Sequence, residues 1–513
     1  MSSPLLARRV LAAAIVLGIT AEILFARSAL GINVLVAVIG LLVAVALIRR
    51  PGARMDRLDR WLPPAVVVFA TFVALRADPL LVLADAAITA VLLGATLVAR
   101  AGVPITRGTF LAAVEVGARL GFAVPTGAAS VIREARGGPG TGRAPAPIAR
   151  LAPFARLAPV ARGLVFGLPL FVIFVTLFAS ADAVFGEWVD TLVSIRLDLG
   201  ELPGRAVFAA AAAWLVAGTL WAVRGDSPPA LAARGSEVRS LGAAAAAVRS
   251  GGLRLPATEV VTVLAALDLL FGVFVGLQFA YLFGGFDTLA ATGLTYAEYA
   301  RRGFLELVVA ATIVGLLVVG LEATLERRSR AYIASLVGLM ALTAVTLASA
   351  MLRLRLYQDA YGWTELRFYA VAMIAFLGFG LIWAAGLVLM ARSRWLPHAL
   401  VASGLVVSIA VNSIGPQDFV TSRNLERVMD PSLVPPGGEV ALDAAYLAGL
   451  GDGAIPRIVE ALPRLRTADR LALLDILAEE HERLATEPRL IGWPAWNLDR
   501  ERARAALADL FGR

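Results

Sequence analysis

The stretch TYAEYARRGFLEL, residues 295–307, crowds two tyrosines, two arginines and two glutamates into one short segment. Arg302 lies four residues after Glu298 and four before Glu306, so these three side chains would share one face of a helix. Arginine binds carboxylate and phosphate groups through two parallel hydrogen bonds, which makes this face a candidate site for anionic or lipid-like ligands. A second stretch, YGWTELRFY, adds residues of the same types. The candidate ligand-binding residues are Tyr296, Tyr299, Arg301, Arg302, Glu306, Tyr361 and Arg367.

The alternative interpretation is that these tyrosines and arginines are anchors at a membrane interface, where both residue types are common. Further acids lie within or beside apolar runs. Glu22, Asp85 and Asp268 fall inside predicted spans, where a carboxylate can relay protons or ions, or can fix helix packing as a buried hydrogen-bonding group. Asp182 and Glu187 are expected at the outer face and would be acid or base candidates in an enzyme.

Several classes of chemistry are disfavoured by the composition. All 47 basic residues are arginine, so no lysine is present for a phosphate-binding loop of the usual kind. GxSxG and HExxH motifs are also absent, and with no cysteine and two histidines we expect neither a metal site nor a cofactor. The formal net charge of +8 is spread over loops without a basic-aromatic platform, so we expect no nucleic-acid partner.

The elements that must position these residues are membrane-spanning helices. Apolar residues make up 59% of the 513 residues, and the mean hydropathy is +0.78. Because a span needs about 20 apolar residues, the apolar runs predict an all-α, polytopic transmembrane helix bundle with about eleven spans, in a range of ten to twelve. The predicted spans are 10–26, 30–48, 62–76, 79–98, 163–181, 205–223, 258–284, 303–321, 331–351, 366–391 and 395–411.

Arginine distribution predicts the orientation in the membrane. With a cytoplasmic N-terminus, inner segments hold 26 arginines and outer loops hold nine, in agreement with the positive-inside rule. An odd number of spans then places the C-terminus outside the cytoplasm, in a multi-pass protein of the inner (plasma) membrane. The basic cytoplasmic loops could also bind anionic lipid headgroups, although ordinary positive-inside orientation is the favoured explanation of their charge.

Composition divides the chain into four segments. Residues 1–100 hold four N-terminal spans, and 101–162 form a basic, Pro/Gly/Ala-rich cytoplasmic loop with an interfacial helix. Residues 163–411 form a seven-helix membrane core, and 412–513 form a small soluble helical domain. That domain is near the lower size limit for an independent core, so it is expected to lean on the membrane helices. Its cluster Trp493, Trp496 and Asn497 would either dock on the outer polar face or the bilayer surface, or supply core aromatics.

The runs LDLLFGVFVGLQFAYLFGG, TYAEYARRGFLEL and YGWTELRFY, with YLAGLGDGAIPRIVEAL and WPAWNLDRERARAAL in the tail, carry a family resemblance. Together they resemble the bacterial polytopic membrane family known as domain of unknown function 4173, over roughly residues 160 to 510. The resemblance implies a membrane fold and location and no particular activity. The motif positions that it carries over are Tyr296, Tyr299, Arg301, Arg302, Gly303, Phe304 and Glu306.

Three hypotheses of function follow. The first is a non-enzymatic envelope protein that transports, or binds and senses, a ligand at the outer Tyr/Arg/Glu cluster. The second is a membrane-embedded enzyme that modifies lipid or glycan. The third is an envelope scaffold or regulator that acts through its C-terminal domain.

Overall fold

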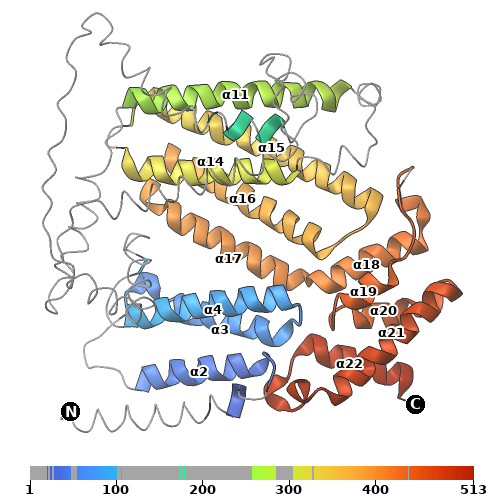
Figure 1. The fold of residues 1–513 in the computed structure, drawn as a ribbon. Coiled ribbons are helices and arrows are strands. Elements are labelled where there is room, and N and C mark those ends of the chain that lie inside the picture. Colours follow the sequence, from blue (N-terminus) through green and yellow to red (C-terminus); the bar gives the residue numbers. More distant parts are fainter. Residues whose placement is uncertain are drawn as a thin grey trace, which may run out of the picture. The chain divides into compact units, whose positions relative to one another are not determined.

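A computed structural model gives the architecture of the chain (Figure 1). The structure describes residues 28–47, 55–100, 105–106, 257–284, 304–325, 328–436 and 438–512, together with a few helical residues within 20–25 and 171–179. All regular elements in these ranges are helices, and no strand occurs among them. The predicted all-α fold is therefore confirmed.

Six helical segments in the described ranges are long and apolar enough to cross a membrane. They coincide with six predicted spans and make the protein membrane-embedded. The apolar part of helix α2 is shorter than these segments. The predicted spans 10–26, 163–181 and 205–223 lie wholly or largely outside the described residues. The six segments are Arg57–Leu75, Pro79–Leu97, Thr258–Gln278, Arg330–Tyr361, Glu365–Leu389 and Ser393–Ile414.

The chain divides into two compact units. Unit 1 comprises Met1–Pro139, Asp359–Tyr369 and Gly404–Arg513, and unit 2 comprises Gly140–Gln358 and Ala370–Ser403. Unit 1 thus combines residues from the predicted N-terminal spans with residues from the predicted soluble domain. The division into four segments along the chain stays a prediction.

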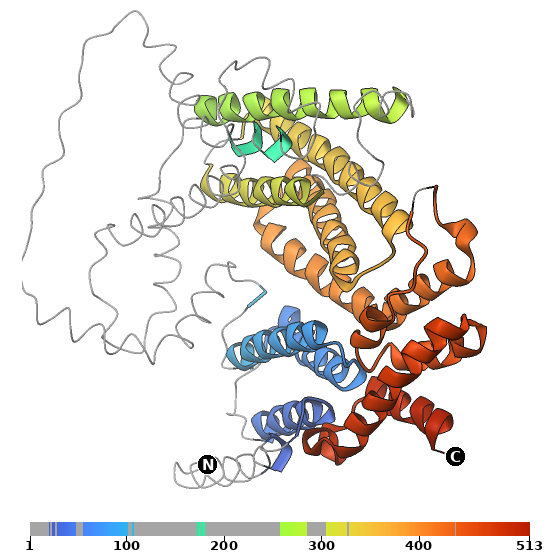
Figure 2. The same cartoon turned by 45° about the vertical axis from the view of Figure 1, so that its right-hand side comes forward.

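Unit 2 has a mainly apolar interior, in which the polar side chains of Gln278, Arg353 and Gln358 are also buried. An aromatic group lies at its centre, where the rings of Phe178 and Phe274 stack with centroids 4.0 Å apart, and Phe271 meets Phe174 and Phe178 edge-on at 5.0 and 4.8 Å. In both views α11 and α14 lie alongside each other, and both supply side chains to this core (Figure 2). The helices of this unit, some of which continue into unit 1, are α11 (Ala257–Gly284), α14 (Phe304–Thr324), α15 (Arg330–Tyr361), α16 (Glu365–Leu389) and α17 (Leu396–Ile414).

One boundary differs from the sequence prediction. The apolar run predicted α15 to end near residue 351, but the helix continues to Tyr361. The added turns, LRLRLYQDAY, contain two arginines and an aspartate. Charge ends an apolar run without ending a helix, because the backbone hydrogen bonds continue wherever no proline or glycine interrupts them.

In unit 1, three apolar helices pack around Val66, Phe69 and Leu92. Two prolines in the first turn of α3 suit its start, because the first turn needs no N–H donors. At the start of α4, a side-chain oxygen of Asp78 accepts a hydrogen bond from the backbone N–H of Leu81 at 3.0 Å, which caps the helix. The three helices are α2 (Ile32–Leu47), α3 (Leu62–Leu75) and α4 (Pro79–Arg100).

The tail of unit 1 is a small helical bundle that packs on these membrane helices. Leu473, Leu477 and Leu507 are fully buried inside it. The backbone N–H groups of Ala29 and Ile32 donate to the carbonyls of Arg489 and Trp496 at 2.8 and 2.9 Å, which joins the start of α2 to the tail. The main tail helices are α18 (Pro416–Met429), α19 (Ala444–Gly449), α20 (Ile455–Ala461), α21 (Thr467–Thr486) and α22 (Leu498–Phe511).

Candidate functional site

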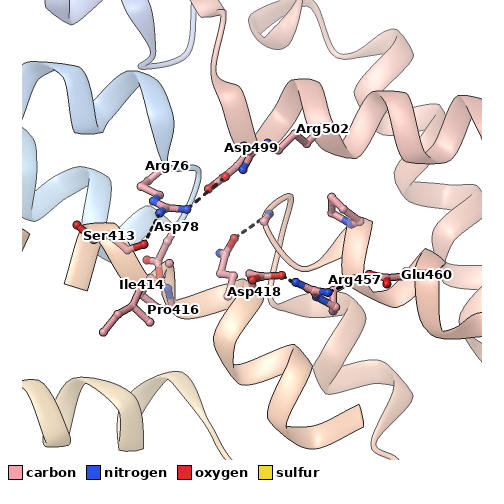
Figure 3. A pocket seen from close by; sticks show the side chains of 14 residues that line it. Arg76, Asp78, Ser413, Ile414, Pro416, Asp418, Arg457, Glu460, Asp499 and Arg502 are labelled. Atoms are coloured by element: carbon pink, nitrogen blue, oxygen red, sulfur yellow. Dashed lines mark hydrogen bonds and ion pairs between the residues drawn. The ribbon is translucent and has the colours of Figure 1, made fainter. Parts of the chain in front are cut away.

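A cavity of about 360 Å³ lies in unit 1 where membrane helices meet the tail (Figure 3). Its walls come from the connection between α3 and α4, the junction of α17 with α18, and the tail helices α20 and α22. Three arginines and four carboxylates line it. These charged residues are Arg76, Arg457, Arg502, Asp78, Asp418, Glu460 and Asp499.

Arg76 follows directly after α3 and reaches the end of α17. Its Nε donates to the backbone carbonyl of Asn412 at 2.7 Å, and its Nη2 donates to the carbonyl of Ser413 at 3.3 Å. Next to it, Gly415 has a φ of +76°, and an added Cβ there would lie 2.6 Å from Nη1 of Arg76. Glycine is therefore required at this position both by the backbone conformation and by the close approach of the guanidinium group.

Asp499 is the carboxylate that faces Arg76. One oxygen lies 3.6 Å from Nη1 of Arg76, and the other accepts a hydrogen bond from the N–H of Ala77 at 3.3 Å. Burial raises the pKa of Asp499 above its ordinary value, although Arg76 and the N–H of Ala77 both act to lower it. Because this contact is long, Nη1 of Arg76 keeps the capacity to donate to a further anionic partner.

Asn497 fixes the position of Asp499 relative to the membrane helices. It is 1% exposed, and its side-chain amide donates to the carbonyls of Val73 and Arg76 at 3.1 and 2.7 Å. Its side-chain oxygen accepts from the N–H of Arg500 and caps α22. The amide thus occupies carbonyls at the end of α3 that have no partner within the helix, and it ties the tail to that end.

Asp78 forms the floor of the cavity on the membrane side. It is 3% exposed, and besides capping α4 it accepts a hydrogen bond from the hydroxyl of Tyr369 at 2.7 Å. Glu365, in the first turn of α16, interacts with both Asp78 and Gln417. Two carboxylates, a phenol and an amide therefore lie together beneath the opening.

The opposite wall is built by α18 and α20. Nε of Arg457 donates to Asp418 at 3.1 Å, and its Nη1 donates to Glu460 at 2.9 Å. The bond with Asp418 raises the pKa of Arg457, which stays charged. Gln417 accepts from the N–H of Gly453 at 3.0 Å and donates to the carbonyl of Leu450, so the loop before α20 is held against α18.

Of the residues predicted from sequence as ligand-binding, Tyr361 and Arg367 are brought together. Arg367 donates to the carbonyl of Tyr361 at 3.2 Å and to that of Gly362, across the turn between α15 and α16. Glu306 lies half-buried in the first turn of α14, in unit 2. The other candidates lie outside the described residues: Tyr296, Tyr299, Arg301, Arg302, Glu22, Asp182 and Glu187.

The two remaining intramembrane carboxylates lie in different units. Asp85, on α4 in unit 1, is fully buried and accepts from the amide of Asn412 at 3.0 Å. Asp268, on α11 in unit 2, is half-buried beside Ser335. A Cβ added to Gly338 on α15 would lie 3.7 Å from its Oδ1, an ordinary contact distance, so the carboxylate lies next to α15.

The sequence analysis did not single out the residues that line the cavity. Arg76 and Asp78 fall at the connection between the predicted spans 62–76 and 79–98, and Arg457 and Asp499 fall in the predicted soluble domain. One local signal was present, because an aspartate followed by a proline at the start of an apolar run indicates a capped helix. No signal in the chain joins residue 76 to residue 499.

The sequence model of a family described as Domain of unknown function (DUF4153) matches residues 63–461. The chain belongs to DUF4153. The sequence motifs indicated family 4173, and the match corrects this number to 4153. The inference of a membrane family without known activity agrees with the match. No curated protein and no solved structure matches the chain.

The DUF4153 match covers α3, α4 and the membrane helices that follow, and it ends at the last residue of α20. Most of the cavity wall therefore lies within the DUF4153 segment, including Arg76, Asp78 and Arg457. Asp499 and Arg502, on α22, lie beyond it. In this DUF4153 protein the cavity is completed by residues outside the matched segment.

Proposed function

We propose that this protein binds a small polar ligand in the cavity of unit 1, and that it serves in transport or sensing at a membrane and not in catalysis. The observation that carries the proposal is the cavity itself, which has both signs of charge at the ends of membrane helices. Its volume of about 360 Å³ is in the range of small-molecule sites.

The charges favour a ligand that carries an anionic and a cationic group, such as an amino acid or a short peptide. Arg76 and Arg502 can bind a carboxylate, since the first holds its carbonyl partners through Nε and Nη2 and the second is exposed. Asp418 and Glu460 lie on the other wall beside Arg457 and can accept from an ammonium group. The alternative is an enzyme that modifies lipid or glycan, with Asp78 or Glu365 as acid or base.

We further propose that the cavity opens on the outer side of a bacterial inner membrane. The helix ends that meet the tail in unit 1 are the start of α2, the end of α3 and the end of α17. All are ends that the positive-inside rule places outside. The same orientation puts the sequence cluster around Tyr296 and Arg302 on the outer face as a second ligand-contacting surface, and the basic loops on the cytoplasmic side against anionic lipid headgroups.

A scaffold that presents its tail to a partner is less favoured. The tail buries Asn497 and Asp499 against membrane helices of unit 1. Because these polar side chains bind the membrane helices, they hold the tail in place and are not available to a partner protein.

The ligand test uses the purified full-length protein in lipid nanodiscs with a panel of amino acids and dipeptides, followed by thermal unfolding. At least one compound should raise Tm in a saturable way, and Arg502→Ala should weaken that effect about tenfold, as loss of one charge-assisted contact predicts. Arg466→Ala removes an exposed tail arginine that does not line the cavity and should change nothing. Equal weakening by both variants, or no stabilising compound, would reject the pocket as the ligand site.

The orientation test uses the absence of cysteine from the chain. Ala485→Cys in the tail and Arg392→Cys in the turn between α16 and α17 are both exposed positions. A membrane-impermeant maleimide should label the first in intact cells and the second only after the inner membrane is opened. The reverse pattern would place the cavity on the cytoplasmic side.

A further inference from the structure

Three polar side chains lie together in the membrane part of unit 1, away from the cavity wall. Asp85 and Thr89 are on α4, four residues apart and therefore on one face of the helix. Asn412 is on α17, and its side-chain amide donates to Oδ1 of Asp85 at 3.0 Å. The exposed fractions of the three residues are 0%, 3% and 1%.

Each of these residues has an oxygen atom without a hydrogen-bond partner. The atoms are Oδ2 of Asp85, Oγ1 of Thr89 and Oδ1 of Asn412. The amide of Asn412 is oriented by its own bonds, because its NH₂ group donates both to Asp85 and to the carbonyl of Ser408 at 3.0 Å. Buried polar oxygens in membrane helices are normally satisfied, so three unsatisfied ones in one place indicate a missing partner.

Thr89 differs from other threonines of the described membrane helices. The hydroxyls of Thr71, Thr96 and Thr343 each donate to the carbonyl four residues earlier, at 2.7–2.8 Å. This local bond is how a threonine satisfies itself within an apolar helix. The hydroxyl of Thr89 does not form this bond, so it is available to a partner on the helix face that carries Asp85.

Asp85 forms no ion pair with an arginine in the described part of the chain. Arg76 acts on its charge from a distance, but the guanidinium group is held by the carbonyls of Asn412 and Ser413 and by Asp499. Asp78 also acts on Asp85, and it carries a charge of the same sign. An ionised carboxylate buried between membrane helices is costly unless a cation or a proton neutralises it.

We propose that Asp85, Thr89 and Asn412 form a binding site for a sodium ion. Hard monovalent and divalent cations take oxygen ligands, and the three free oxygens here are a carboxylate, a hydroxyl and an amide carbonyl. One sodium ion cancels the single negative charge, and in the proposed site the three oxygens bind it together. A proton on Oδ2 of Asp85 would turn that oxygen into a donor to one of the other two oxygens and leave the third without a partner.

This inference goes beyond ligand binding in the cavity and does not depend on it. The two sites are nevertheless connected through Asn412, whose side chain holds Asp85 while its backbone carbonyl accepts from Arg76 in the cavity wall. Asp85 lies seven residues beyond Asp78 on α4, roughly 10 Å along the helix axis. A cation at Asp85 therefore acts on the residue that positions the arginine of the ligand site.

The experiment measures thermal unfolding of the purified full-length protein in nanodiscs, with NaCl replacing choline chloride at constant ionic strength. Sodium should raise Tm in a saturable way, because a ligand that binds only the folded state stabilises it. Asp85→Asn should abolish the effect, and Thr89→Val should weaken the apparent affinity about tenfold, which corresponds to about 1.4 kcal/mol. Thr89→Ser keeps the hydroxyl and should bind as the wild type does.

Asp268→Asn is the matched control, since it removes a half-buried carboxylate on another membrane helix, in unit 2. It should keep the sodium effect in full. The proposal is overturned if sodium raises Tm no more than choline does, or if the effect survives in both Asp85→Asn and Thr89→Val. A Tm that depends on pH through Asp85 and is insensitive to sodium would also overturn it, and would assign a proton to the site instead.

Discussion

The two units stabilise their interiors in different ways. Unit 2 is held mainly by an aromatic and aliphatic cluster in which Phe174, Phe178 and Phe271 are 0% exposed, although Gln278, Arg353 and Gln358 are buried there as well. Unit 1 buries directional polar groups where its segments meet: Asn33, Asp78, Asn412, Gln417 and Asn497 are all at most 3% exposed. Each of these five binds a backbone group or a side chain of another element or turn.

The difference follows from what each unit must join. Helices packed side by side in lipid can associate through shape, because dispersion contacts add along their whole length. Unit 1 joins helix ends and loops, whose backbone N–H and C=O groups have no partner within the helix. Polar side chains satisfy those groups and fix one arrangement, so the polar interior of unit 1 also creates the cavity.

The largest expected effect comes from Asp452, in the loop between α19 and α20. Its two oxygens bind Arg483 at 2.5 Å and Arg500 at 3.3 Å, and Arg500 is almost fully buried. Asp452→Ala leaves that guanidinium buried without its carboxylate partner and should lower the free energy of unfolding of the tail by about 3–5 kcal/mol. Limited proteolysis and chemical unfolding measure this. Asp509→Ala, at an exposed position on α22, should have no such effect.

Asn497→Ala should be next. It leaves the carbonyls of Val73 and Arg76 unsatisfied and removes the cap of α22, a cost of roughly 2–3 kcal/mol. The tail should become sensitive to protease while unit 2 keeps its resistance. Trp493→Ala, four residues earlier and 60% exposed, is the comparison. If it destabilises the protein as much as Asn497→Ala does, the indole and not the amide anchors the tail.

Phe271→Ala tests the apolar interior of unit 2. It should lower the free energy of unfolding by less than about 3–5 kcal/mol, the range for this substitution in a water-surrounded core. The reason is that lipid tails already surround the helices with apolar groups. Denaturation in mixed micelles gives the value. Leu269→Ala, on the same helix and 70% exposed, should be close to neutral. A loss for Phe271→Ala above that for Asp452→Ala would reverse the comparison between the units.

The smallest effect concerns Asp499. Burial raises its pKa above the ordinary 3.8, so the folded state holds a proton that the unfolded state has lost. Its contribution to stability is therefore greatest below pH 3.8 and falls as the pH rises through the raised pKa. Asp499→Asn should flatten this part of the profile of Tm against pH, and Asp509→Asn should not. An unchanged slope in Asp499→Asn would show that another group is responsible.

The helices were predictable where the signal is local. The spans at 62–76 and 79–98 appear as α3 and α4 within a few residues, because length and apolar composition suffice to specify a membrane helix. The end of α15 was missed, since charge and helix termination are separate properties. Residues of the predicted site at 296–302 lie outside the described structure, so their role stays a prediction.

The candidate site was hardly predictable. Arg76 and Asp499 are separated by hundreds of residues and have no periodic pattern that relates them. Asp85 was recognised as an intramembrane carboxylate, but its partners could not be assigned, because Asn412 comes from a helix distant in the chain.

The sequence by itself determined that this protein is all-helical and membrane-embedded, because the cost of unpaired backbone groups in lipid leaves an apolar run few alternatives to a helix. Only the tertiary structure decided which helix ends meet, that the tail closes a cavity over them, and that the amide of Asn412 reaches the buried Asp85 on another helix. Hydrogen bonds and ion pairs between distant segments depend on positions in space, and these are not encoded in local composition or periodicity.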